Sequence, residues 1–238
     1  MHNQDEVIDL TQTLGPETVV WPGDDPVSFE TTGEVHTVGS FQRKVLTPEH
    51  AGTHIDAPAH YVPDGITVEQ IPVERLVVEA AVLDASQQCE RDSDHAVEAA
   101  DLEAFESRHG RLPNGGAVLL HTGWSRYQTD PQRMLGGDSL EDFHFPGFAG
   151  SAAELMVERG VVGIGVDTIS VDPGVAAADN SWPVHNVAQP AGLWLLEGLS
   201  RLERLPPTGA TIVVGALPLA GGSGAPARVL ALVPADAR

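Results

Sequence analysis

Cysteine is almost absent from this chain, since Cys89 is the only one among 238 residues. A single cysteine cannot form an internal disulfide, and it argues against a zinc site built from thiolates. Cys89 also lies in a polar run, which favours an incidental residue over a nucleophile. The hydrophobic content of 42% is nevertheless enough for one sizeable core. We therefore expect one domain over residues 1–238.

Basic residues are scarce as well. The chain has 13 lysines and arginines against 34 acidic residues, a formal net charge of −21, and Lys44 is its only lysine. A surface this negative repels phosphates, so nucleic-acid binding is disfavoured. Two explanations of the acidity stay open. A GC-rich genome encodes arginine in place of lysine, or the surface is adapted to high salt, which screens the self-repulsion.

Long hydrophobic runs are also missing. No apolar run is long enough to span a membrane, and residues 1–6 are polar, without the apolar core of a secretory signal. We expect a cytoplasmic protein without a membrane partner.

Residues 50–60, His-Ala-Gly-Thr-His-Ile-Asp-Ala-Pro-Ala-His, are the most informative part of the chain. They place His50, His54, Asp56 and His60 within eleven residues. Imidazole nitrogens and carboxylate oxygens together suit Zn²⁺, Mn²⁺ or Fe²⁺ better than Ca²⁺ or Mg²⁺, which prefer oxygen ligands. The segment therefore predicts a divalent-metal site. The alternative is a set of solvated loop histidines.

The backbone of this segment is expected to be extended, because its glycine and proline make a continuous helix improbable. In a strand, side chains at i and i+2 point the same way. His54 and Asp56 would then share a face and grip one ion, while Ile55 turns into the core. His50 must come from the preceding bend, where Gly52 permits a tight backbone approach.

The pattern His-x-Gly-Thr-His-x-Asp-x-Pro-x-His resembles the signature of the cyclase, or kynurenine formamidase-like, family of metal-dependent hydrolases. Shorter matches to the family extend the resemblance over almost the whole chain. They lie at residues 9–11, 21–24, 122–124, 165–168, 170–173 and 224–228.

The resemblance implies a ligand set for one or two divalent ions per subunit, Zn²⁺ or Mn²⁺. In two-metal relatives, the counterparts of His50, His54 and Asp56 bind one ion, and those of Asp56, His185 and Glu197 bind the other. Glu197 follows the apolar run 193–196, where a buried carboxylate is costly unless something satisfies it. The alternative for Glu197 is a solvated residue at the end of a strand.

The resemblance also implies roles for two further residues. His60 corresponds to the residue that transfers protons, although a histidine that orients a metal ligand is the alternative. Trp21 corresponds to a residue near the substrate pocket. Trp124 could be either a pocket wall or a core residue, and we interpret Asp167 as structural.

A metal site of this kind predicts hydrolysis. Coordination lowers the pKa of water from about 16 toward about 7, so that metal-bound hydroxide is available as a nucleophile at neutral pH. With the resemblance, this predicts cleavage of an amide C–N bond, in a formamide or a cyclic amide, of a small aromatic substrate, as in arylformamidases and isatin hydrolases. Two other classes stay open: a lyase or cyclase that uses the ion as a Lewis acid, and a non-enzymatic metal-binding protein.

Short apolar runs bounded by glycine, proline or aspartate predict an α/β fold with few helices. The predicted strands are 7–10, 45–47, 76–83, 117–121, 161–166, 211–217 and 229–233, and the predicted helices are 99–108 and 151–159, the second opening with a capping box. Residues 128–144 read as a surface excursion. The resemblance implies a swivelling β/β/α architecture with a central mixed sheet, and a homo-oligomer, either a homodimer or a homotetramer.

Overall fold

The computed structural model describes residues 6–137 and 142–235. Its strands are β1 (Glu6–Asp9), β2 (Ser28–Gly33), β3 (Gln42–Leu46), β4 (His54–Asp56), β5 (Val77–Asp84), β6 (Ala96–Val97), β7 (Ala117–His121), β8 (Gly147–Phe148), β9 (Gly163–Val166), β10 (Trp194–Glu197), β11 (Ala210–Ala216) and β12 (Gly224–Val233). Its α-helices are α1 (Val35–Val38), α2 (Ser86–Arg91), α3 (Ala99–His109), α4 (Pro131–Leu135), α5 (Gly150–Glu158), α6 (Gly174–Ala178) and α7 (Pro183–Ala188).

Eight strands form a mixed sheet in the order β1-β12-β11-β5-β7-β9-β10-β4. Strands β5, β7, β9 and β10 run parallel to their neighbours among these four, and the other pairings are antiparallel. Because β4 also pairs with β12, the seven strands from β12 to β4 form a closed sheet. The predicted mixed sheet is thus confirmed, and its closure is a feature that the sequence did not predict.

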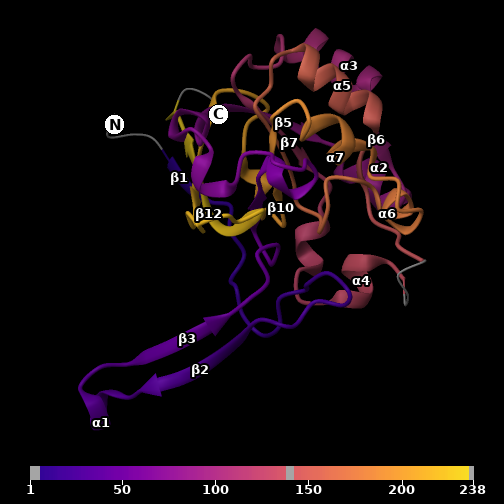
Figure 1. The fold of residues 1–238 in the computed structure, drawn as a ribbon. Coiled ribbons are helices and arrows are strands. Elements are labelled where there is room, and N and C mark those ends of the chain that lie inside the picture. The colour runs from indigo at the N-terminus through magenta and orange to yellow at the C-terminus, as the bar shows by residue number, and fades with distance from the viewer. Residues whose placement is uncertain (1–5, 138–141, 236–238) are drawn as a thin grey trace.

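Apolar side chains pack on both faces of the closed sheet. Ile55, Leu119 and Leu196 belong to the core inside it. The neighbouring residues in the strands, such as Leu120 and Leu195, point outward into a second core shared with the helices. Helix α5 contacts both α3 and α7, and these three helices lie on the side of the closed sheet away from β1 and β12 (Figure 1). Strands buried on both faces explain the continuous apolar runs in the sequence.

Most predicted elements are present, with ends that shift by a few residues. The predicted strand 117–121 matches β7, and the predicted helix 99–108 matches α3 to within one residue. The predicted capping box was wrong. Helix α5 has Ala149 as its N-cap, with no side-chain cap bond, and the Ser151 hydroxyl instead accepts a hydrogen bond from the Ala99 backbone N–H.

The predicted surface excursion 128–144 is anchored to the core. It contains α4, whose Met134 and Leu135 are buried, and Phe143 is buried after it. Residues 138–141 of this segment lie outside the described residues. Helices α4, α6 and α7 are five or six residues long, which is too short for the spacing of their apolar residues to predict a helix.

No helix in the described part of the chain combines the length and the apolar character needed to cross a membrane.

Candidate functional site

Strand β4 places two of the predicted ligands in the closed sheet. His54 and Asp56 are almost fully buried, and Ile55 between them points into the inner core, as the alternation predicted. The register of β10 on β4 sets Glu197 directly opposite His54. His54 Nε2 lies 3.2 Å from Asp56 Oδ1 and 3.4 Å from Glu197 Oε2.

His50 reaches the same cluster from the bend before β4. Gly52 has φ of +66°, a left-handed conformation that glycine adopts without strain and that supports the predicted tight bend. The His50 Nδ1–H donates to Asp56 Oδ1 at 2.6 Å, and Nε2 lies 2.9 Å from the Ser223 hydroxyl. Gly224 leaves room for this ring, since a Cβ there would lie 2.5 Å from His50 Cε1.

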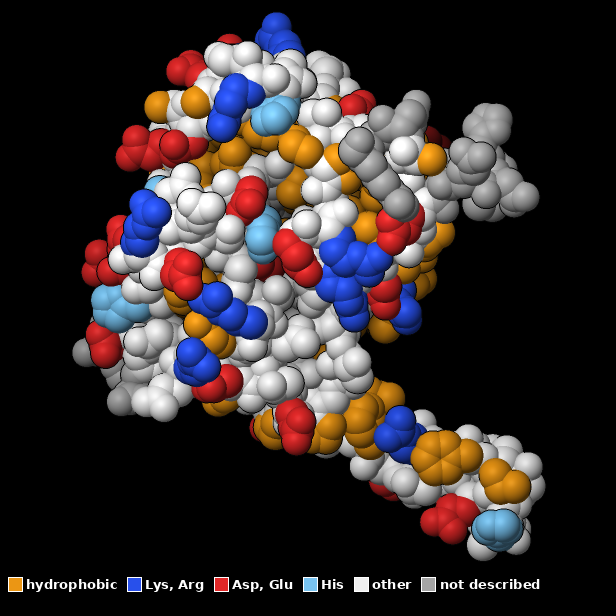
Figure 2. Space-filling view, turned by 180° about the vertical axis from the view of Figure 1, so that it is seen from behind, with side chains coloured by type: hydrophobic (Ala, Val, Ile, Leu, Met, Phe, Trp, Pro, Cys, Tyr) orange, Lys and Arg blue, Asp and Glu red, His pale blue; other side chains and the backbone are white. Residues whose placement is uncertain are grey.

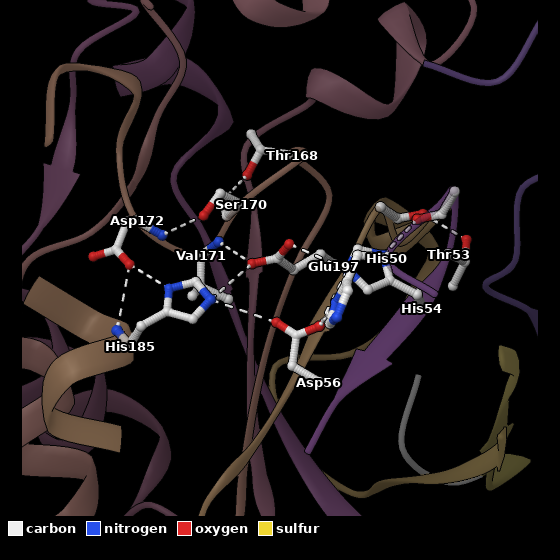
Figure 3. Close-up of polar contacts among 12 residues, drawn as sticks. His50, Thr53, His54, Asp56, Thr168, Ser170, Val171, Asp172, His185 and Glu197 are labelled. Atoms are coloured by element: carbon white, nitrogen blue, oxygen red, sulfur yellow. Dashed lines mark hydrogen bonds and ion pairs between the residues drawn. The ribbon is translucent and has the colours of Figure 1, made fainter. Parts of the chain in front are cut away.

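His185 reaches the cluster from α7. Its Nε2 lies 3.4 Å from Asp56 Oδ2 and 3.7 Å from Glu197 Oε1. On the other side of the ring, Nδ1 donates to Asp172 Oδ2 at 2.5 Å (Figure 3). The same carboxylate accepts the backbone N–H of Val184 at 2.6 Å. Asp172 is fully buried and sets the orientation of His185. Histidines that bind metals typically donate the N–H of their other ring nitrogen to a carboxylate in this way.

The buried carboxylates of this cluster favour positive charge beside them, as the pKa values of its residues show. Burial alone would lower the pKa of His54, but the Asp56 and Glu197 carboxylates raise it to about 10. Burial acts the same way on His185, and bonds to Asp172 and Asp56 raise its pKa to about 10. Burial would raise the pKa of Asp56, but the surrounding histidines hold it well below its usual value. Carboxylates at such a buried point require positive charge beside them.

The donor atoms fit a divalent metal. His54 Nε2 and Asp56 Oδ2 are buried without a hydrogen-bond partner, a condition that costs free energy unless another group satisfies them. Ligand atoms of His50, Asp56 and His60 lie within 4.8 Å of one another, and so do those of His54, Asp56 and Glu197. Asp56 belongs to both groups. Mixed imidazole and carboxylate donors suit Zn²⁺, Mn²⁺ or Fe²⁺.

A cavity of about 320 Å³ opens beside the cluster. Its lining residues are Trp21, Asp24, His50, His60, Tyr61, Ile169, Ser170, Trp182, His185 and Glu197. Trp21 and Trp182 lie on one side of it, with ring centroids 5.6 Å apart. Tyr61 packs on the His185 ring at 4.4 Å. The cavity therefore has flat aromatic walls next to the candidate ligands.

His60 faces this cavity from the 3-10 turn Pro58–His60 after β4. Its ring stacks on that of His50, with centroids 4.0 Å apart and an interplanar angle of 26°. Partial burial, together with the nearby histidines, lowers the pKa of His60, although the charge of Asp56 opposes the shift. A neutral imidazole in this position can accept a proton from one atom and give it to another.

The structure brings together every residue that the sequence predicted for the site, and it moves two others away. Trp124 is a core residue, whose indole N–H donates to the Met134 carbonyl. Asp167 is buried and accepts hydrogen bonds from the backbone N–H groups of Thr122 and Gly123, as a structural residue would.

Sequence reasoning missed three residues at the site: Tyr61, Asp172 and Trp182. Tyr61 directly follows His60, and Asp172 lies in one of the matched family motifs, so both had a weak signal. Trp182 had none, because its place beside Trp21 depends on packing between segments far apart in the chain.

The closed mixed sheet and its buried cluster of histidines and carboxylates are those of a protein that can hold a divalent metal. The family described as "Putative cyclase" matches residues 8–173, and the chain belongs to this family. The match includes the whole segment 50–60 and ends before His185 and Glu197.

Known relatives agree with this family. The chain is 31% identical to the isatin hydrolase of Roseibium aggregatum over 244 residues, covering 96% of this chain and 92% of the relative. It is 30% identical to the kynurenine formamidase of Geobacillus thermodenitrificans over 223 residues, covering 93% and 94%. Both relatives hydrolyse amides.

Solved structures show the same fold. An isatin hydrolase bound to the product analogue thioisatinate superimposes with a TM-score of 0.90 at 31% identity, covering 97% of this chain and 93% of that one. Isatin hydrolase A from Ralstonia solanacearum gives a TM-score of 0.88 at 37% identity, covering 96% and 92%.

Proposed function

We propose that this protein is a metal-dependent hydrolase that cleaves the amide C–N bond of a small aromatic substrate. A cyclic amide of the isatin type is the first choice, and an aryl formamide is the second. The observation that carries the proposal is that three of the candidate ligands, His50, His185 and Glu197, line the same cavity as His60 and the aromatic walls. The similarity to isatin hydrolases along almost the whole chain supports it.

In this proposal the ions are Zn²⁺ or Mn²⁺, one or two per subunit. The residues that hold them are His50, His54, Asp56, His185 and Glu197. A divalent ion supplies two things in such a site: it lowers the pKa of a water molecule, and it polarises the carbonyl under attack. The protein supplies the rest, namely orientation of the ligands and the substrate, and proton transfer.

His60 is the proposed proton-transfer residue. Its lowered pKa keeps the imidazole neutral at physiological pH, so it can take the proton of the attacking water and then give it to the departing amide nitrogen. The stack on His50 holds its ring beside the cluster. Opening of a cyclic amide in this way would leave an amine and a carboxylate on one product.

The aromatic walls are the proposed substrate contacts. Trp21, which the resemblance implies near the pocket, lies with Trp182 against the cavity. The two rings contact each other and together form an apolar wall on which a planar substrate can pack. The carbonyl of such a substrate would then face the candidate ligands.

The proposal is tested by metal analysis together with product analysis. We expect one or two ions per subunit in the wild type and fewer in His185→Ala, with His109→Ala on the exposed end of α3 as the matched histidine control. Isatin and an aryl formamide are then supplied in ¹⁸O-labelled water. Hydrolysis places solvent oxygen in a carboxylate or formate product, whereas a dehydrating lyase does not. Turnover that survives complete metal removal would refute the proposal.

A further inference from the structure

Residues 21–24, Trp-Pro-Gly-Asp, form a tight turn beside the cavity. The Asp24 backbone N–H donates to the Trp21 carbonyl at 3.0 Å, and Gly23 has φ of +104°. A proline at the second position and a glycine with positive φ at the third fit a type II turn. The first and fourth residues of this turn, Trp21 and Asp24, both line the cavity. The turn therefore sets a carboxylate beside an aromatic wall.

The two residues differ in their contacts. The Trp21 ring centroid lies 5.1 Å from that of the buried Phe143 and 5.6 Å from that of Trp182, so packing holds this end of the turn. The Asp24 side chain is exposed, and within the described part of the chain it has no hydrogen bond or ion pair. A residue that is exposed and also lines a cavity lies at its opening. Asp24 thus places an uncompensated negative charge at the opening.

The two ends of the cavity differ in charge. Its inner end holds the candidate ligands His185 and Glu197, which are 3% and 5% exposed and lie where a cation would bind. Its outer end holds Asp24. Among the described residues, no arginine or lysine lines the cavity. A molecule inside it therefore meets a cation site at one end and a free carboxylate at the other.

A ring substrate would reach both ends. This step rests on the proposed function, in which the substrate carbonyl faces the candidate ligands. The cavity of about 320 Å³ is at the small end of the range for ligand pockets. The edge of a bicyclic ring that is remote from the carbonyl would then lie near the opening and near Asp24. Walls of low dielectric constant focus the field of a charge in such a place.

We propose that Asp24 determines substrate specificity by charge. It selects cyclic amides and aryl formamides whose remote edge is neutral or donates a hydrogen bond, and it rejects those that carry a carboxylate or a sulfonate there. An anionic group in this position would lie beside the Asp24 carboxylate with no cation of the cavity lining to neutralise it. A formamide with a side chain that ends in a free carboxylate is therefore a poor substrate.

Two matched substrates measure this preference. Isatin-5-sulfonate carries a negative charge on the remote edge, and isatin-5-sulfonamide has nearly the same size without the charge. We expect the wild type to have a higher kcat/KM for the sulfonamide. The ratio of the two kcat/KM values should fall about fivefold or more in Asp24→Asn, which is the effect of two like charges about 4 Å apart in water, and further in Asp24→Lys. Intrinsic reactivities of the two compounds cancel when this ratio is compared between variants.

The same experiment distinguishes this inference from the proposed function. An unchanged ratio in both variants, with both isatins still cleaved, would overturn the role of Asp24 and leave the proposed function intact. The circular dichroism spectrum should not change in either variant, because the Asp24 side chain is exposed and makes no bond to the described residues.

The charge of the whole molecule needs a control of its own. Acidic side chains are spread over the surface, as Figure 2 shows for one face. Asp25→Asn removes the same unit of charge from the next residue, which is exposed and is not one of the lining residues. Its ratio should equal the wild-type ratio. A fall as large as that in Asp24→Asn would assign the repulsion to the surface as a whole and overturn the proposal.

Binding without turnover tests Asp24 apart from hydrolysis. Oxindole-5-sulfonate and oxindole-5-sulfonamide keep the ring but lack the ketone that activates isatin, and titration calorimetry measures their affinities. We expect the wild type to bind the sulfonamide more tightly and Asp24→Asn to lose most of this preference. That result would support the role of Asp24 even if the isatins were not cleaved, which would refute the proposed function alone. Equal affinities of the wild type for the two oxindoles would contradict selection by Asp24.

Discussion

Asp56 lies against the three histidines that are candidate metal ligands, His50, His54 and His185. Its Oδ1 faces His50 and His54, and its Oδ2 faces His185. The three imidazoles offset part of the cost of burying this carboxylate, because each has a ring nitrogen within 3.4 Å of one of its oxygens.

His60 should be needed for turnover and not for metal binding. We expect His60→Gln to lower kcat by about 10²- to 10⁴-fold, the usual contribution of a general acid–base residue. Metal content per subunit should stay at the wild-type value, which elemental analysis measures on the same sample. Equal losses of metal and activity would make His60 a ligand, and undiminished kcat would remove it from proton transfer.

Asp172 should act through His185. We expect Asp172→Asn to weaken metal affinity about 10- to 100-fold. A neutral amide holds the His185 ring less firmly than the carboxylate does, and it makes the other ring nitrogen, Nε2, a weaker metal ligand. Competition with a chelator measures this affinity. Asp167→Asn is the matched control, since that buried carboxylate bonds the backbone N–H groups of Thr122 and Gly123 away from the cluster. Equal effects in both variants would point to general destabilisation.

At the scale of elements, the side chains of neighbouring strands pack so closely that some glycines leave no room for a larger residue. Gly163 on β9 lies under the Trp194 ring of β10, and a Cβ there would lie 2.2 Å from Trp194 Cη2. We expect Gly163→Ala to lower the free energy of unfolding by about 1–3 kcal/mol. Gly215→Ala on β11, whose nearest contact would be 3.2 Å from the Arg228 carbonyl oxygen, should cost less in the same urea titration. The reverse order would contradict this packing.

The segment after α4 is held by a titrating ion pair. Hydrogen bonding to Asp94, with Asp142 nearby, raises the pKa of His144 in the folded state. The stabilisation is therefore fully present below about pH 6.5, the unfolded value, and is lost as pH rises through the folded value. We expect the difference in unfolding free energy between wild type and His144→Gln to shrink from pH 5.5 to pH 8.5. A difference that stays constant or grows over this range would contradict the prediction.

For the whole molecule, the net charge of −21 is the dominant electrostatic property. Repulsion among 34 acidic side chains opposes the folded state in dilute buffer, and salt screens it. If the acidity is an adaptation to high salt, the thermal midpoint should be higher in molar KCl than in dilute salt. Differential scanning calorimetry measures it, and an equal or lower midpoint would leave only the codon-usage explanation.

Much of the candidate site could be predicted because four of its residues lie close together in the sequence. His50, His54, Asp56 and His60 lie within eleven residues, and the period of a strand alone sets His54 and Asp56 on one face. Five strands of the closed sheet, β5, β7, β9, β11 and β12, were predicted for the same reason, since alternation and buried apolar runs depend only on neighbours in the chain. The domain count, by contrast, stays a prediction.

What the sequence by itself determined, then, is the chemistry of the donor atoms, the path of β4 and the acidic character of the surface, because each depends on composition or on residues a few positions apart. Only the tertiary structure decided that β4 pairs with both β10 and β12, so that Glu197 lies opposite His54 and the sheet closes. It also placed Asp172 behind His185 and Trp182 beside Trp21. These contacts join segments that are separated by a dozen to more than a hundred residues, and packing of the whole chain, rather than any local preference, selects them.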